Sequence, residues 1–175
     1  MSDLPRTALS RGSVGSLPEL AGRYLEEYLD KIRLALAELD EEQVWWRPAP
    51  GTNSAANLLL HLCGNLSLWI LAGAGGRPYQ RHRGGEFAAQ GGFTKAELVE
   101  RLTRVVGDCR EVLAALDAGD LGRPLEVQGY ETDLLSAVVH GVEHMSYHTG
   151  QIVWIAKQLR AGTAPFEFYP RHSGE

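Results

Sequence analysis

Residues 132–160 read TDLLSAVVHGVEHMSYHTGQIVWIAKQLR, the longest helical pattern in the chain. Residues 132 and 133 are typical helix N-cap types, and Gly162 stands where a helix of this length would end. Apolar residues gather on one side of its helical wheel: Leu134, Met145, Ile152 and Leu159. The segment therefore predicts an amphipathic helix with one face turned toward a core.

Three further helical patterns precede this segment, and each follows capping residues. Residues 16–19 (SLPE) start a helix that runs to about residue 39, and residues 94–97 (TKAE) start one that runs to about residue 116. Between them, residues 52–54 (TNS) supply N-cap candidates for a helix that runs to about residue 72. The chain shows neither an alternating strand pattern of any length nor an internal repeat. Four long helices predict an all-α fold, a four-helix bundle.

The same patterns divide the chain into one domain and two flanking segments. We expect residues 1–15 to be a flexible N-terminal arm, residues 16–162 to be the bundle, and residues 163–175 to be an aromatic tail that packs on it. A long Gly-rich loop is expected at residues 73–92, between the second and third helices, and a turn-rich connector at residues 119–129. A loop as long as residues 73–92 is uncommon in a compact domain and is usually functional or disordered.

Charge and cysteine content exclude several classes of protein. The 175 residues carry a net charge of −5, which disfavours a nucleic-acid partner because such binding needs a basic footprint. Cys63 and Cys109 lie in apolar helical patterns and are expected to be buried thiols of a reducing compartment. The chain begins without the apolar stretch of a secretory signal, and residues 58–74 hold too many polar groups for a membrane span. We therefore expect a cytoplasmic protein with no membrane partner.

Three of the six histidines fall at His140, His144 and His148, which is a spacing of four. Because an α-helix turns by about 100° per residue, each step of four moves the position by only about 40°, and all three share one stripe. Two histidines at this spacing can direct both imidazoles at one metal ion. On the helical wheel His144 and His148 face the apolar side, and His140 lies at its edge.

The second predicted helix carries a matching polar stripe, formed by Asn57, His61 and Asn65. Two polar stripes inside an apolar bundle are costly unless their groups are satisfied. One divalent ion held by His61, His144 and His148 satisfies them together and leaves a coordination position open, which is the catalytic pattern. Zinc or nickel is the preferred ion, with iron or manganese as alternatives, since imidazole suits all four. Hydrogen-bonded core histidines without a metal are the competing interpretation.

A second motif competes for the same residues. The string His140-Gly-Val-Glu143-His144 matches the H-x-x-E-H pattern of inverted zincin peptidases, in which both histidines bind zinc and the glutamate is a general base. That pattern needs a distant acidic ligand, yet Glu167 and Glu175 are the only acids after His144. It also leaves His148 without a role, so we favour the three-histidine site.

Four stretches resemble the DinB superfamily, in a bacterial branch of that family. They are residues 45–48 (WWRP), 53–66 (NSAANLLLHLCGNL), 83–87 (RGGEF) and 143–152 (EHMSYHTGQI). The resemblance extends over all four predicted helices, about residues 16–160. Its most specific part is the run from His144 to Gln151.

The resemblance implies a bundle of up-down-down-up topology that assembles as a homodimer, with metal ligands His61, His144 and His148. It gives His140 no ligand role, which leaves a hydrogen bond to a ligand or a substrate contact. Some members of the family are thiol-dependent, namely bacillithiol or mycothiol S-transferases and a maleylpyruvate isomerase. A low-molecular-weight thiol is therefore a candidate co-substrate, bound at the metal as a thiolate.

Other residues near the stripes are candidates for substrate contacts. Asn65 and Gln151 could hold a substrate or instead link the helices by hydrogen bonds, and Tyr147 is a candidate proton donor. In the Gly-rich loop, Arg77 and Arg81 with Arg83 could bind the carboxylate of a thiol cofactor, although solvated loop charges are the simpler interpretation.

These observations support two functions from different classes. The first is a metal-dependent enzyme that acts on small molecules, either as a thiol S-transferase or as a hydrolase, with no catalytic residue assigned. The second is a non-catalytic metal-binding or stress-response protein with the same bundle.

Overall fold

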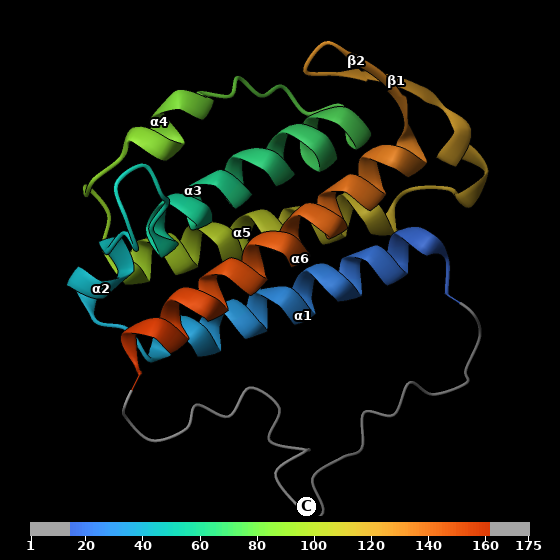
Figure 1. The fold of residues 1–175 in the computed structure, drawn as a ribbon. Helices are drawn as coiled ribbons and strands as arrows, with labels where there is room; N and C mark the ends of the chain where they lie inside the picture. Colours follow the sequence, from blue (N-terminus) through green and yellow to red (C-terminus); the bar gives the residue numbers. More distant parts are fainter. Residues whose placement is uncertain (1–14, 162–175) are drawn as a thin grey trace, which may run out of the picture.

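The computed structural model describes residues 15–161, and its four long helices form a bundle (Figure 1). They are α1 (Leu17–Ala37), α3 (Ala55–Leu66), α5 (Lys95–Ala114) and α6 (Leu134–Leu159). Helices α1 and α6 run in one direction, and α3 and α5 run in the other (Figure 1). The up-down-down-up bundle expected from the sequence is confirmed.

Each long helix begins at a side chain that caps its free backbone N–H groups. Ser16 and Glu19 form a capping box at α1, and Thr94 and Glu97 form one at α5, as the sequence predicted. Ser54 caps α3 through the backbone N–H of Asn57. At α6, Asp133 accepts from the N–H of Ser136. The caps fix where the helices start, and therefore which residues face inward.

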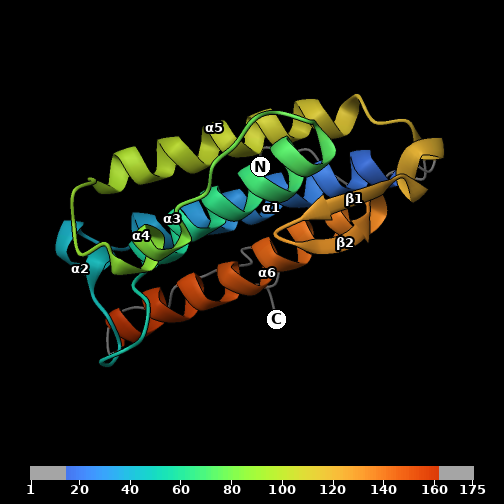
Figure 2. The ribbon, with the colours of Figure 1, turned by 90° about the horizontal axis from the view of Figure 1, so that it is seen from above.

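Helix α3 is the most deeply placed element of the bundle. All of its residues are buried, and the chain continues into the π-helix η1 (Ser67–Ala74). Seen from above, α3 lies between α5 and α6 (Figure 2). The stretch Ala55–Ala74 is apolar and long enough to cross a membrane, but 83% of that window is buried inside the fold. It is the core helix of a globular domain.

The Gly-rich segment differs from the open loop that the sequence predicted. It contains the short helix α4 (Arg83–Ala88), which lies over α3 (Figure 1). Two hydrogen-bond donors hold it there: Asn57 Nδ2 donates to the carbonyls of Glu86 (3.0 Å) and Ala89 (2.9 Å), and Arg47 Nη2 donates to those of Phe87 (3.0 Å) and Ala89 (3.1 Å). A second short helix, α2 (Glu41–Trp45), follows α1.

The connector before α6 also holds regular structure, so the expectation of turns without strands was wrong. A short 3-10 helix, η2 (Ala118–Gly122), precedes an antiparallel hairpin of β1 (Pro124–Val127) and β2 (Tyr130–Asp133). Gln128 and Gly129 make its two-residue turn with φ of 56° and 77°, the backbone that this kind of hairpin needs. Strands of four residues are too short to show alternation against the surrounding turn residues.

Three features predicted for the ends of the chain fall at or beyond the described part. The N-terminal arm (residues 1–15, of which only residue 15 is described), the aromatic tail (163–175) and the role of Gly162 as a helix end remain predictions.

Candidate metal centre

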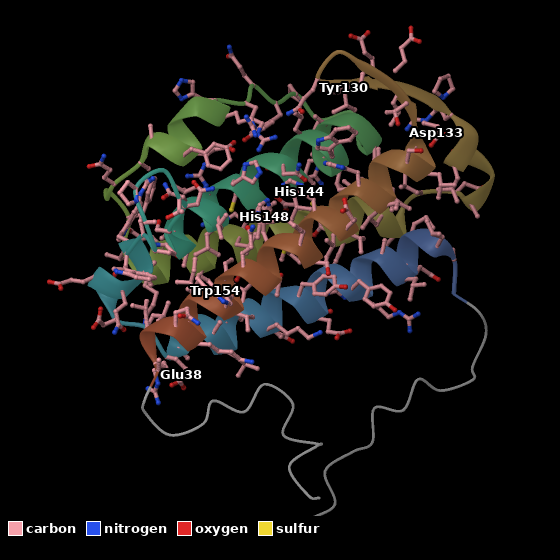
Figure 3. All side chains as sticks on the ribbon, viewed as in Figure 1. Glu38, Tyr130, Asp133, His144, His148 and Trp154 are labelled. Atoms are coloured by element: carbon pink, nitrogen blue, oxygen red, sulfur yellow. The ribbon has the colours of Figure 1, made fainter. Side chains whose placement is uncertain are left out.

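Helices α3 and α6 bring three histidines together at the middle of the bundle. His61 comes from α3, and His144 and His148 lie one turn apart on α6, on its side facing α3 (Figure 3). One ring nitrogen from each lies within 4.8 Å of those of the other two. The Nε2 atoms of His61 and His144 are 2.9 Å apart. The structure thus assembles the trio predicted from the sequence.

The three rings suit a divalent cation. Burial, together with the neighbouring histidines, lowers the pKa of His144 to about 3, and burial also lowers the pKa of His148. These two imidazoles are therefore neutral at pH 7, as metal ligands must be. In a tetrahedral zinc site two ligand nitrogens lie about 3.3 Å apart, which is within the 4.8 Å limit that contains the cluster.

Hydrogen bonds on the outer side of two rings hold those rings in place. His148 Nδ1 donates to Gln151 Oε1 at 2.7 Å, and His61 Nδ1 lies 2.9 Å from Glu86 Oε2. Ligand histidines typically make such a bond through the nitrogen that does not touch the metal. The Nε2 atoms of both residues then present their lone pairs to the centre of the cluster.

Glu86 and Arg81 belong to the same network, although no role for Glu86 was predicted from the sequence. Arg81 pairs with Glu86 through two bonds of 2.8 Å, with side chains only 7% and 10% exposed. Burial raises the pKa of the Glu86 carboxyl, but hydrogen bonds from His61 and Arg81 outweigh it and hold the pKa below its ordinary value. Arg81 is therefore neither a solvated loop charge nor free to bind a substrate carboxylate. One sequence signal was the placement of Glu86 within the RGGEF stretch.

The other two loop arginines lie apart from the three rings. Arg77 is 3.7 Å from carboxylate oxygens of Asp108 and Glu111, and the Arg83 guanidinium lies over the Phe87 ring at 5.0 Å. Phe87 in turn packs on His61, with ring centroids 4.6 Å apart. Neither arginine has a contact with the histidine cluster that would support a substrate role.

His140 lies beside the cluster and outside it. Its Nε2 accepts from Asn65 Nδ2 at 3.2 Å, and its ring lies 4.1 Å from Trp69 and 5.2 Å from His144, between centroids. Burial lowers its pKa, so it is neutral at pH 7. Asn65 Oδ1 is buried without a hydrogen-bond partner among the described residues. An acceptor in this position could take an N–H, O–H or S–H group from a bound ligand.

The remaining candidates point to the outer face of α6. Tyr147 is 61% exposed, with its ring 5.0 Å from that of His148. Glu143, the base in the peptidase interpretation, lines an apolar groove of about 510 Å³ between α1 and α6. Within residues 15–161, the group of side chains that could hold a metal ion includes His148 and omits His140, contrary to the H-x-x-E-H pattern.

Comparisons with known proteins agree with this architecture. The family model described as DinB superfamily matches residues 24–152. A conserved protein from Enterococcus faecalis has a similar structure, with a TM-score of 0.69 and 17% identity over 82% of this chain and 97% of its own. A DinB-like protein from Bacillus cereus gives 0.62 and 15% over 82% and 95%, and one from Bacillus subtilis 0.62 and 16% over 84% and 96%. No curated protein matches the sequence. At these identities the solved structures bear on the fold alone.

Proposed function

The chain belongs to the DinB superfamily, and we propose that it is a metal-dependent enzyme that acts on small molecules through His61, His144 and His148. One observation carries the proposal: three imidazoles from two helices converge inside the bundle, with one ring nitrogen of each within 4.8 Å of those of the other two. A common cation would bind the nitrogens on the inner side of the rings, while Glu86 and Gln151 hold the outer nitrogens of His61 and His148.

Three protein ligands leave a position for a further group, as catalytic sites do. When bound there, a divalent ion would act as a Lewis acid toward a thiol or a water molecule. Zinc or nickel fits the all-imidazole donor set best, and iron or manganese is the alternative. Around this position Asn65 offers a buried acceptor and His140 a neutral ring, both suited to orient a small ligand.

We propose thiol transfer as the leading reaction and hydrolysis as the second. The test uses untagged protein loaded with cobalt(II), to which glutathione, bacillithiol, mycothiol or coenzyme A is added. A sulfur-to-cobalt charge-transfer band that one of these thiols induces, and that His144→Ala abolishes, supports transfer. Failure of every thiol to bind removes that reaction and leaves hydrolysis or metal binding without turnover.

We also propose a homodimer, formed through the outer face of α1 and α6. Five exposed apolar side chains line the groove between these helices: Leu17, Leu20, Tyr24, Val139 and Tyr147. Contiguous apolar patches of this kind are typical of protein interfaces. Val139→Glu would then convert a dimer to a monomer in light-scattering measurements, whereas Arg104→Glu on α5 would leave the dimer intact. A monomeric wild-type protein removes this proposal.

A reducing compartment such as the cytoplasm remains the proposed location. Both cysteines are free and buried, which agrees with an environment that forms no disulfides.

A further inference from the structure

We propose that Glu86, held by Arg81, is a positioning residue that fixes the orientation and tautomer of His61 for metal binding. The inference rests on the proposed metal site and extends it to residues on the α4 segment. Glu86 is not one of the three ligands: it lies 25 positions from His61 in sequence and on a different helix.

The carboxylate approaches His61 from the side away from the cluster. Glu86 Oε2 lies 2.9 Å from His61 Nδ1, whereas His61 Nε2 faces His144. Because the two ring nitrogens point in different directions, Glu86 cannot reach the same ion as His61 Nε2 without leaving its present position. The carboxylate therefore acts on the ring and not on the metal.

The contacts favour a proton on His61 Nδ1. An unprotonated Nδ1 would set its lone pair against a carboxylate oxygen, which is unfavourable. A protonated Nδ1 donates to Glu86 Oε2, which also accepts from Arg81 Nη2 at 2.8 Å. Arg81 Nη2 also lies 3.0 Å from Nδ1, and a guanidinium could donate to this nitrogen only in the other tautomer. Because Arg81 Nη2 already has Glu86 Oε2 as an acceptor, whereas the carboxylate beside Nδ1 can only accept, the Nδ1–H form satisfies both groups. This tautomer leaves Nε2 unprotonated and ready to bind a metal ion.

Gly64 gives the carboxylate room to reach the helix. A Cβ atom on Gly64 would lie 2.0 Å from Glu86 Oε1 and 3.0 Å from Arg81 Nε. An alanine at this position must displace the ion pair, although it would favour the helix itself by about 1 kcal/mol. A substitution at Gly64 would therefore move the Glu86 carboxylate without removing it, which makes Gly64 a useful site for a test.

The experiment compares zinc affinity, by competition with a chromogenic chelator, with the tautomer of His61 read from ¹⁵N ring shifts. Glu86→Ala is expected to weaken zinc binding by about 10- to 100-fold, and Glu86→Gln by less because its amide oxygen can still accept. In the metal-free protein, the Nδ1–H form of His61 is expected to predominate in the wild type and to be lost in Glu86→Ala.

Gly64→Ala keeps every charge but moves the carboxylate, so it should reproduce the Glu86→Ala loss in affinity. Gly107→Ala on α5 is the matched control, since a Cβ there meets nothing within 4 Å. Glu100→Gln controls for loss of one surface charge. Both controls should bind zinc like the wild type.

Unchanged affinity in both Glu86→Ala and Gly64→Ala overturns the inference, as does an Nε2–H tautomer in the wild type. A wild-type protein that binds no zinc overturns the proposed function instead. In that case a His61 tautomer that depends on Glu86 still supports the positioning role.

Discussion

The two sides of the candidate metal centre are built differently. On α3, His61 is 4% exposed, and Glu86, Arg81 and the Phe87 ring enclose it. On α6, His148 is held by a neutral amide one turn along its own helix, and the exposed Tyr147 stands beside it. On the α3 side an ion pair thus holds His61, whereas on the α6 side a neutral amide holds His148.

The largest expected effect is loss of the metal when either α6 ligand is removed. His144→Ala or His148→Ala should reduce metal content from about one ion per chain to below about a tenth, because two imidazoles hold an ion poorly. Elemental analysis of untagged protein measures this content. His82→Ala, at an exposed position, should leave it unchanged.

The same measurement separates the two metal motifs. His140→Ala should retain the ion, since His140 lies outside the cluster. If His140→Ala loses the ion while His148→Ala keeps it, the H-x-x-E-H interpretation replaces the three-histidine site.

The next effect concerns how well the buried cysteines of α3 and α5 are shielded from reagents in solvent. Burial raises the pKa of Cys63 on α3 to about 12 and also raises that of Cys109 on α5, whose Sγ lies against the Leu66 carbonyl. At pH 8 both thiols should react with a disulfide reagent at least about 100-fold more slowly than in urea-unfolded protein. Equal rates in the folded and the urea-unfolded protein would show that α3 and α5 open readily.

A smaller effect is expected from the hydrogen-bond partner on the α6 side. Gln151→Ala should weaken zinc binding by about 10-fold, toward the lower end of the range for such partners, since a neutral amide supports His148 less than a carboxylate supports His61. Chelator competition gives the value, with Gln158→Ala on the exposed side of α6 as the control. A loss greater than that of Glu86→Ala would reverse the proposed ranking of the two sides.

The smallest effect is a change in stability at Asn65. Its unpartnered Oδ1 costs free energy, so Asn65→Leu should leave the free energy of unfolding unchanged or raise it by about 1 kcal/mol. Urea unfolding measures this value, and zinc affinity should change less than about twofold because Asn65 bonds His140 and none of the three ligands. A clear loss of stability would mean that the bond to His140 outweighs the unpaired oxygen.

The two sides also differ in how far the sequence could predict them. The α6 ligands and His61 were predictable because a spacing of four within one helix fixes a shared face. Glu86 and Arg81 were not, since their distance from His61 depends on how α4 folds back over α3. Gly64 offered a signal in principle, but a helical glycine indicates a close approach without saying which segment approaches. The hairpin was missed because Leu125 and Val127 give only one alternation.

The π-helix η1 has a consequence for helical register. A helix with i to i+5 bonding turns each residue through a smaller angle than an α-helix, so it behaves as an α-helix with an inserted residue. Residues spaced by four within η1 are therefore rotated differently around the axis than in an α-helix, and Trp69 in η1 packs against the His140 ring. Deleting one residue of η1 should restore α-helical winding and rotate Trp69 away from His140. In an alignment, a relative with an unbroken α-helix would show a one-residue gap within residues 67–74.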